Sequence, residues 1–515
     1  MIDPARVATM GNGEAIERAA VPHLPFDEFR RTILAAVAEG LRVGALFASP
    51  TVTAAATGGA GLNLLVVLLD DLSASIHVAT TDLPPGPFAS LTPECPQLHL
   101  FEREIAEQFG VELRDHPWLK PVRFHAADPD RTAPVATPRG APPTIGVIDW
   151  FRVEGDEVHE VAVGPVHAGV IEPGHFRFQC HGEKVFHLEI SLGYQHRGVE
   201  SRMAGGPDRR TVHYVETLAG DTTIGHATAY CLAVEALAGV HVPACAQAIR
   251  GIALELERLA NHVGDLGALA GDVGFLPTAA YCGRIRGDWL NLTAALCGSR
   301  FGRDLVRPGG VGFDVDATLA KGLLQRLADA ERDAASAVNL LWDSSTVMSR
   351  FEDAGRLSRK VAAEIGLVGL AARACGIGRD VRRDFPAGIF RFSHVPVSTW
   401  STGDVFARAY VRWLEVQQSI RFIREQLEAL PAGAVATSVG RLAPNRLVVS
   451  LVEGWRGEIC HVASTGSDGK FDRYKVVDPS FHNWFGLALA LRDQQISDFP
   501  LCNKSFNLSY CGHDL

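Results

Sequence analysis

The sequence predicts an α+β protein, in which a small N-terminal α+β domain precedes a large, mainly helical domain whose first part is rich in strands. Three observations support this fold class. Runs of strand length fill much of the first 125 residues, a stretch rich in proline interrupts the chain at 126–144, and helical periodicity dominates from about 210 to 430. At 515 residues the chain is too long for one ordinary domain. We expect an N-terminal tail (1–25), a small domain (26–125), a linker (126–144) and a large domain (145–515).

The small domain is expected to combine two helices with three strands. Apolar residues recur at helical spacing over 26–40 and again over about 100–109. Three runs of strand length lie between these helices, at 42–48, 62–70 and 75–81. The charged residues of the second helix are expected on its polar side; they are Glu102, Arg103, Glu104 and Glu107.

Prolines mark the linker. Pro129, Pro134, Pro138, Pro142 and Pro143 all fall within 126–144, and prolines at that density favour an extended spacer without secondary structure. This is the clearest domain boundary in the chain.

The large domain begins and ends with strands and is helical between them. The predicted strands are 147–153, 159–163, 175–181 and 184–190 before the helices, and 447–454, 457–463 and 473–477 after them. A short helix over about 483–490 leads to the C-terminal tail. Several of the helices between about 210 and 430 are apolar on most faces, which predicts a buried bundle.

One helix of this bundle, Val242–Leu269, carries a polar stripe. Its members are Glu255, Arg258, His262 and Asp265, which share one face because they recur at helical spacing. A solvated or subunit-facing stripe is the more common arrangement. The alternative is a stripe that lines a buried polar cavity.

Composition excludes some functions. Hydrophobic residues make up 47% and charged residues 21%, as in a folded globular protein. The net charge of −10 argues against nucleic-acid binding, which needs a basic face. We find no export signal and no apolar run long enough to cross a bilayer. The ten cysteines are scattered without a Cys-x-x-Cys pair, and most are expected to be reduced and buried.

Four polar motifs hold candidate functional residues. They are a Gly-Pro-x-His loop with His167, the stretch 196–200 with Glu200, the stretch 216–235 with His226, and the tail with Cys511 and His513. An imidazole and a carboxylate buried together can relay protons, although surface or core histidines and incidental pairs are the more common explanation of such spacings. Dinucleotide-binding, phosphate-binding and nucleophile-elbow motifs are absent. The residues alone therefore establish no chemistry.

Taken together and in this order, the motifs resemble a known family. The stretches that carry the resemblance are 98–124, 196–200, 258–262, 307–311, 373–386 and 409–427. They are similar to the large subunit of group 4 energy-converting nickel–iron hydrogenases, of the formate hydrogenlyase type, and to the 30 kDa and 49 kDa subunits of respiratory complex I fused in that order. The resemblance covers nearly the whole chain. It implies a domain like the complex I 30 kDa subunit, followed by a domain like the hydrogenase large subunit or the complex I 49 kDa subunit.

The resemblance also assigns positions to the nickel ligands, and this sequence departs from them. In the family, two Cys-x-x-Cys pairs hold the nickel–iron centre, because soft thiolates suit these metals. The equivalent positions here are Ala219, Thr222, Ser509 and Gly512, and Cys511 lies next to the last of them. We therefore expect no nickel–iron centre and no metal bound by this chain.

Only one of the two residues that contact the quinone in complex I has a counterpart in this sequence. In the 49 kDa subunit a histidine of the Gly-Pro-x-His loop and a tyrosine contact the quinone; His167 matches the histidine, whereas the tyrosine position is Gly220. Polar positions that border the family's buried cavity are retained, and we take these as candidate cavity or proton-relay residues: Glu200, His226, Asp380, Arg382 and Arg383. Buried charges are costly unless paired or used.

Three functions follow from the resemblance. The first is a hydrogenase-related subunit without nickel, which couples electron transfer to ion movement. The second is a working oxidoreductase subunit that uses quinone, through His167, or another substrate. The third is a structural scaffold. The expected partners are a small subunit with a 4Fe-4S cluster and membrane subunits of antiporter-like and anchor type, which would place the chain on the cytoplasmic, inner face of the cell membrane.

Overall fold

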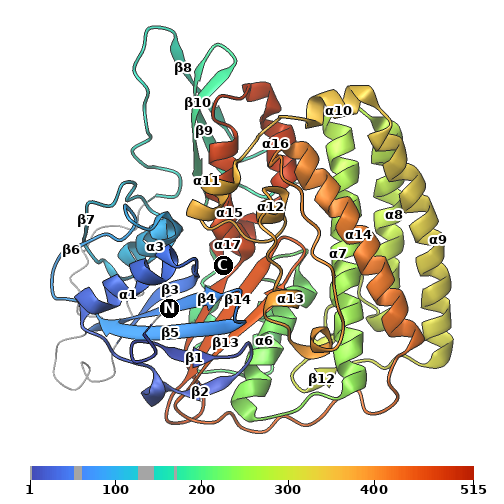
Figure 1. Cartoon of the computed structure of the whole chain (residues 1–515), viewed down its shortest axis with the longest axis horizontal. Coiled ribbons are helices and arrows are strands. Elements are labelled where there is room, and N and C mark those ends of the chain that lie inside the picture. The colour runs from blue at the N-terminus through green and yellow to red at the C-terminus, as the bar shows by residue number, and fades with distance from the viewer. Residues whose placement is uncertain (1–2, 51–60, 126–143, 168–170) are drawn as a thin grey trace.

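The computed structural model describes residues 3–50, 61–125, 144–167 and 171–515 (Figure 1). The N-terminal sheet has the order β1-β5-β4-β3, with all neighbours antiparallel. Its strands are β1 (Ala8–Met10), β3 (Arg42–Pro50), β4 (Leu62–Asp70) and β5 (Ser75–Asp82). Helices α1 (Phe26–Ala38) and α3 (His99–Phe109) pack with it. The three strands and two helices expected of the small domain are confirmed.

Residues 1–25, expected to form a tail, contribute to both large sheets. Strand β1 pairs with β5, and β2 (Ala15–Glu17) pairs with β13 (Arg446–Glu453), almost at the other end of the chain. Asn12, between them, donates to the carbonyl groups of Phe385 and Leu451. This segment is therefore part of the folded structure, because distant strands satisfy its backbone groups.

The C-terminal sheet joins the two parts of the molecule. Its order is β15-β14-β13-β2, with β14 (Glu458–Thr465) and β15 (Phe471–Val477). Successive side chains of a strand point to opposite faces: Val449 and Val462 join the core of the N-terminal domain, whereas Val448 and Ile459 join the core of the large domain. The small and large domains thus pack against opposite faces of one sheet.

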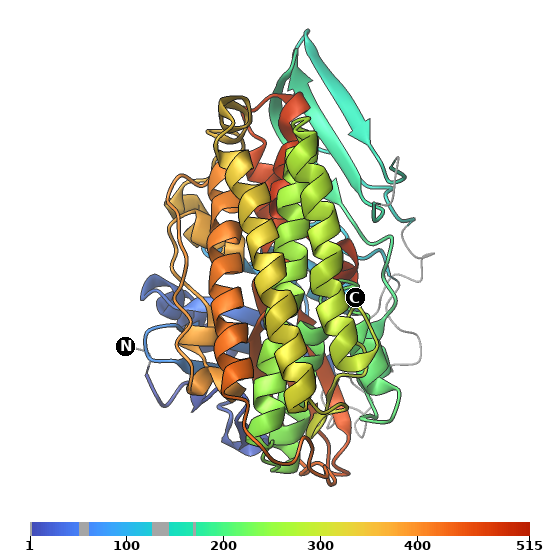
Figure 2. The same ribbon diagram turned by 90° about the vertical axis from the view of Figure 1, so that its right-hand side faces the viewer.

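Four long helices form a bundle beyond this sheet (Figure 2). They are α7 (Ala244–Asp272), α8 (Leu276–Cys297), α9 (Ala317–Trp342) and α14 (Val405–Glu428). Helix α6 (Thr223–Ala238) lies between the sheet and the bundle, with twelve of its residues buried. A helix that is apolar on most faces must be covered all round, so α6 occupies the centre of the large domain. Among the described residues, no helix combines the length and apolar character that a membrane span requires.

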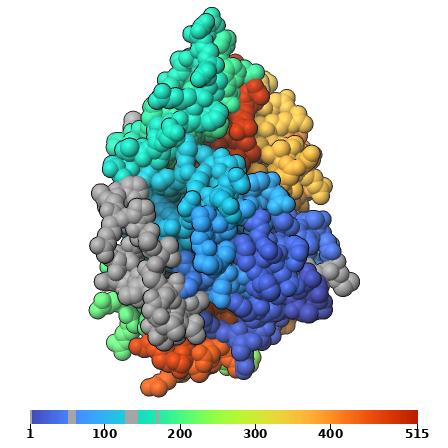
Figure 3. All heavy atoms as spheres, turned by 90° about the vertical axis from the view of Figure 1, so that its left-hand side faces the viewer, coloured from blue at the N-terminus to red at the C-terminus, as the bar shows by residue number. Residues whose placement is uncertain are grey.

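A three-stranded sheet projects from one end of the molecule (Figure 3). It consists of β8 (Val158–Val163), β9 (His175–His181) and β10 (Lys184–Ser191), as predicted. The strand predicted over 147–153 is wrong. Side chains, not a neighbouring strand, bind this segment: Phe151 donates its backbone N–H to Glu189, and Val153 donates to Gln179.

Shorter elements complete the fold. They are β6 (Phe88–Ala89), β7 (Leu113–Arg114), β11 (Val306–Arg307), β12 (Gly310–Val311), α4 (Val199–Met203), α5 (Thr211–Glu216), α10 (Ser345–Phe351), α11 (Arg359–Glu364), α12 (Gly369–Ala374), α13 (Val381–Asp384), α15 (Pro479–Ala490), α16 (Phe499–Phe506), α17 (Tyr510–Asp514) and the single turns η1 (Arg18–Ala20), η2 (Pro96–Leu98), η3 (Gly388–Arg391) and η4 (Ile496–Asp498). The predicted linker lies, apart from Thr144, outside the described residues, and the domain boundary there stays a prediction.

Acid is expected to weaken the contact between α3 and α15. Burial, reinforced by Arg42, lowers the pKa of His482, which packs on Phe101, to about 3. The unfolded chain takes up this proton near an ordinary histidine pKa of about 6.5, so stability is lost as the pH falls from there toward 3. Replacing His482 with phenylalanine should flatten the pH dependence of the unfolding free energy by about 1.4 kcal/mol per pH unit between about pH 4 and 6. Urea unfolding at each pH measures the slope.

The matched control for this experiment is His159→Phe, at an exposed position of β8. We expect the slope of that variant to equal the slope of the native protein. An equal slope in His482→Phe would show that His482 is protonated in the folded state as readily as in the unfolded chain.

Candidate functional site

Four of the five predicted cavity residues are buried, and these four lie in three separate clusters. Their exposed fractions are 6% for Glu200, 0% for His226, 3% for Asp380 and 5% for Arg382. Asp380 and Arg382 belong to a charge network in the bundle, His226 to a chain of hydrogen bonds along the C-terminal sheet, and Glu200 to an ion-pair cluster beneath α3. Arg383, by contrast, is exposed and pairs with Asp384.

The first cluster, here called the central network, connects α7, α14 and β13 through α12 and α13. Its members are Glu255, Arg258, His262, Asp265, Arg373, Asp380, Arg382, Arg412, Glu415 and Glu453. All of them are buried. The interpretation of the α7 stripe as solvated is therefore wrong; the stripe is buried, whereas the polar cavity that the alternative places beside it stays a prediction. The stripe is buried because α14 supplies Glu415 and Arg412 opposite it.

Arg373 lies at the centre of this network. Its Nε donates to Glu415 Oε1 over 2.9 Å, and its Nη1 donates to Glu453 Oε1 over 2.7 Å. The side chain has no exposed surface. Arg382 continues the network, with Nη2 at 2.6 Å from Asp380 Oδ2 and Nη1 at 3.0 Å from both oxygens of Glu255.

Two carboxyl groups of the network have pKa values that are shifted in opposite directions. Burial alone would raise the pKa of Asp380, but the guanidinium groups of Arg382 and Arg373 outweigh it and lower that pKa to about 2. Burial, with the charge of Asp380 nearby, raises the pKa of Glu453 to about 7. Carboxyl groups whose pKa values are pushed apart in one site are typical of proton exchange. Glu453 is the member of the network that can gain or lose a proton near neutral pH.

The second cluster is a linear chain of four proton-carrying groups, here called the histidine chain. Tyr474 Oη lies 2.9 Å from His461 Nδ1, His461 Nε2 lies 3.1 Å from His226 Nδ1, and His226 Nε2 lies 3.0 Å from Asp478 Oδ2. None of the four side chains is more than 1% exposed. Burial lowers the pKa of His461 well below its usual range, so this imidazole is neutral.

The hydrogen bonds of the histidine chain run in one direction. A carboxylate only accepts, so His226 donates from Nε2, and in its neutral form it accepts at Nδ1. His461 then donates from Nε2 and accepts at Nδ1 from the hydroxyl of Tyr474. This arrangement lets a proton move along the chain by successive transfers, each over one hydrogen bond.

The third cluster surrounds Glu200. Lys475 Nζ lies 3.1 Å from Glu200 and 2.6 Å from Glu104, and Arg123 also pairs with Glu104. Glu200 further accepts the backbone N–H of Val476. The expected polar side of α3 is thus largely buried: Glu102, Arg103 and Glu104 are at most 7% exposed. The 90–92 segment covers Glu102, and the 120–124 segment and the C-terminal sheet cover the other two.

The positions assigned to the nickel ligands lie close together in space. Arg197 donates to Leu218 O and Cys511 O, and Arg456 donates to Asp221 and to Asn507 O. The loop before α6 and the C-terminal tail are therefore adjacent, as the resemblance implies. Two segments that are far apart in the sequence meet at one site.

The hydroxyl groups at two of these positions are already engaged within the protein, and a third position is obstructed. Thr222 Oγ1 accepts from Trp455 Nε1, and Ser509 Oγ accepts from the backbone N–H of Gly512. A Cβ atom on Gly512 would stand 2.7 Å from the carboxyl carbon of Asp478, so a cysteine side chain would collide with that group. These residues do not fit a nickel–iron centre, which needs four free thiolates.

The nearby Cys511 does not repair the ligand set. Burial and the charge of Glu172 raise the pKa of its thiol to about 11, so it is not a thiolate at neutral pH. Across the described residues, no three or more His, Cys, Asp or Glu side chains are arranged to hold a metal ion.

The loop with His167 borders the same region. His167 Nε2 lies 3.1 Å from Gly174 O, and Glu172 of this loop accepts the backbone N–H groups of Tyr510 and Cys511. A Cβ atom on Gly220, at the tyrosine position of the quinone site, would meet no atom within 4 Å. The structure thus brings His167 near the tail but provides no phenol at Gly220.

Sequence reasoning missed His461, Tyr474, Asp478 and Glu453. His461 and Tyr474 occur in predicted strands, where alternation predicts only which face they occupy. Their contact depends on the register of β14 and β15, in which His461 faces Val476 and Ala463 faces Tyr474. Asp478 follows β15 and caps α15, a common structural role for aspartate.

Comparison with known proteins identifies relatives along most of the chain. Residues 30–131 match the model of the respiratory-chain NADH dehydrogenase 30 kDa subunit, and residues 272–514 match that of the 49 kDa subunit. The carbon monoxide-induced hydrogenase of Rhodospirillum rubrum is 30% identical over 352 residues, which are 97% of that protein and 68% of this chain. Formate hydrogenlyase subunit 5 of Escherichia coli (strain K12) is 29% identical over 437 residues, 76% of that protein and 82% of this chain. An NADH-quinone oxidoreductase subunit of Clostridium beijerinckii is 31% identical over 323 residues, 87% of that protein and 62% of this chain. The chain therefore belongs to the group 4 hydrogenase-like family related to complex I, with the 30 kDa and 49 kDa subunit domains fused in one polypeptide.

Proposed function

We propose that this chain is the large peripheral subunit of a membrane-associated redox complex, and that it couples electron transfer to ion movement without a nickel–iron centre. The observation that carries the proposal is the contrast between two regions. The nickel-ligand positions hold Ala219, Thr222, Ser509 and Gly512, none of which supplies a thiolate, whereas the buried proton-carrying groups nearby form an unbroken chain of hydrogen bonds.

The proposed coupling uses the histidine chain and the central network. Asp478, at one end of the histidine chain, lies against Gly512 and so borders the region where the family binds its metal. Reduction and reoxidation of the 4Fe-4S cluster of a partner subunit would change the charge next to this region. A chain of aligned hydrogen bonds and a carboxyl group such as Glu453, with its pKa raised to about 7, respond to such a charge by moving protons. Antiporter-like membrane subunits on the inner face of the cell membrane would use that response.

A second candidate function is quinone reduction in the same region. The adjacency of the His167 loop, the loop before α6 and the tail favours it, because these segments together border the open space beside Gly220. A quinone carbonyl would accept a hydrogen bond from His167, whose Nε2 faces Gly174 O in this structure. Because a glycine, Gly220, stands at the tyrosine position, a bound quinone would have one hydrogen-bond partner fewer.

Metal analysis and activity of the purified complex test these proposals. We expect far less than one nickel per chain and no evolution of hydrogen from reduced methyl viologen, because the ligand positions supply no thiolate. A nickel–iron hydrogenase purified by the same protocol is the positive control. Stoichiometric nickel would overturn the first proposal. Reduction of a short-chain quinone, lost in His167→Ala, would support the second.

A further inference from the structure

A pocket lies at the far end of α6 from the metal-ligand positions. Its volume is about 380 Å³, within the range of sites for small molecules. It is lined by the last turns of α6, the first turns of α7, the end of β13, and the segment from α13 through η3. Its α6 lining residues run from Thr228 to Ala236, which lie roughly 9–21 Å along the helix from Thr222. The pocket is therefore separate from the metal-ligand positions, although it borders the central network.

The interior of this pocket is mainly apolar. Leu232, Leu254, Phe385, Ile389 and Phe390 form much of its wall. The acidic residues of the wall are already neutralised: Arg250 binds Glu235 over 2.6 Å, and Arg373 binds Glu453 over 2.7 Å.

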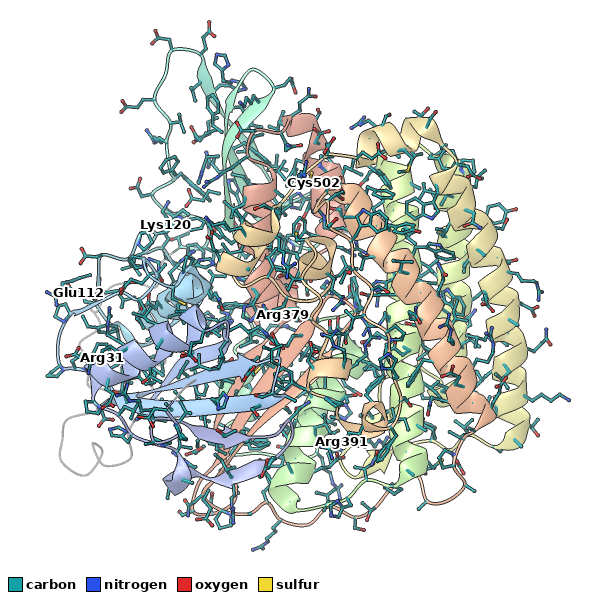
Figure 4. The ribbon with its side chains drawn as sticks, in the orientation of Figure 1. Arg31, Glu112, Lys120, Arg379, Arg391 and Cys502 are labelled. Carbon is teal, nitrogen blue, oxygen red and sulfur yellow. The ribbon has the colours of Figure 1, made fainter. Side chains whose placement is uncertain are left out.

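One cation of the pocket has no such partner. Arg391, at the end of η3, is exposed, and its Nε donates only to Pro386 O at 3.3 Å. Within the part of the chain that the structure describes, no carboxylate pairs with it. Figure 4 labels Arg391 at the lower end of the molecule, on the segment that leads to α14. The pocket thus has an apolar interior and an unpaired positive charge at its mouth.

We propose that this pocket binds a small amphipathic carboxylate, with its hydrocarbon part inside and its charged group on Arg391. The chemistry of the lining selects this class. A cation would be repelled by Arg391, and a small polar anion would leave the apolar wall without a partner. An apolar body gains free energy by leaving water, while a carboxylate at the mouth keeps its hydration and gains a bond to a guanidinium group.

Such a ligand would also touch the central network. Arg382 and Glu453 line the inner part of the pocket, together with Val381 and Val452. A hydrocarbon chain there would exclude water from the part of the pocket wall that Arg382 and Glu453 share. The pocket is thus placed to modulate proton exchange at Glu453, and this inference does not depend on whether nickel is bound elsewhere.

Binding of decanoate to the purified full-length chain tests the proposal by isothermal titration calorimetry below the micellar concentration. We expect saturable binding of one decanoate, weakened about 10-fold in Arg391→Gln because one charge-assisted bond is lost. Decan-1-ol, which lacks the charge, should bind the native protein and Arg391→Gln equally. The matched control Arg326→Gln removes an exposed arginine of α9 outside the pocket and should bind decanoate as the native protein does.

The location of the ligand needs its own test. Leu232→Trp fills the pocket and should abolish binding of both compounds. A photoreactive diazirine analogue of decanoate should label the peptide that contains Phe385–Arg391 in the native protein, and this readout remains if Leu232→Trp fails to fold. Absence of saturable binding, labelling confined to other peptides, or unchanged affinity in Arg391→Gln would each overturn the proposal.

Discussion

Replacing Arg373 with methionine is expected to lower the free energy of unfolding by about 3–5 kcal/mol, as measured by urea denaturation. The guanidinium group of Arg373 neutralises Glu415 and Glu453, and all three side chains are at most 3% exposed. Methionine fills a similar space but supplies neither charge nor donor. The two carboxyl groups then stay buried with one cation fewer. The loss of unfolding free energy is large because a buried carboxylate that lacks a paired cation is poorly solvated.

The control is Arg284→Ala, which removes an exposed arginine that also pairs with two acids, Asp288 and Asp333. Water screens that site, so we expect a change of no more than about 1 kcal/mol. The change in unfolding free energy for Arg373→Lys should fall between these two values. A lysine keeps the positive charge, but its single ammonium group does not reproduce the planar guanidinium group that binds both carboxylates. A loss below about 1 kcal/mol in Arg373→Met would mean that solvent reaches the network.

The buried charges of the central network are not explained by stability alone. Buried ion pairs contribute little to stability compared with well-packed apolar side chains of similar volume. The bundle around Arg373, Glu415 and Arg382 is otherwise apolar, and apolar residues would stabilise it at least as well. Retention of so many charges therefore favours a role in proton or conformational coupling over a role in stability alone, as proposed above.

Much of the fold could be predicted from hydrophobic spacing. The strands of the N-terminal domain, the strands after 445 and the bundle helix predicted over Val242–Leu269 each have a strong period, and the structure contains them close to the predicted bounds. The segment 147–153 also alternates, but its backbone binds Glu189 and Gln179 rather than a strand. The sheet pairing of Ala8–Met10 and Ala15–Glu17 was not predictable, because three-residue strands have too little pattern to detect.

The site was predictable only in part. Helical spacing indicated that Glu255, Arg258 and His262 share a face, and the family resemblance predicted that the loop before α6 and the tail meet. Neither argument predicts what lies opposite a side chain. Glu415 reaches His262 across the bundle, and His461 reaches His226 through strand register; both contacts depend on the packing of elements distant in sequence.

Replacing Asp478 with asparagine is expected to slow electron-coupled proton translocation by the intact complex on the order of 100-fold, the scale of a lost proton-transfer group. Asparagine is nearly the same size as aspartate and caps helices equally well, so α15 should keep its start at Pro479. Its amide group, however, can donate toward His226 Nε2. His226 then carries its proton on Nδ1, which faces the Nε2–H of His461, and the direction of the histidine chain is broken.

Membrane vesicles that contain the complex, driven by reduced viologen with a short-chain quinone as electron acceptor and followed with a pH-sensitive dye, provide the measurement. Tyr474→Phe removes the hydroxyl at the other end of the chain and should slow translocation similarly, because both variants interrupt one path. Asp472→Asn, an exposed position of β15, is the matched control and should leave the rate unchanged. If Asp478→Asn and Tyr474→Phe both translocate protons at the native rate, the histidine chain is structural; if only one of them is slow, protons enter or leave the chain between His226 and His461.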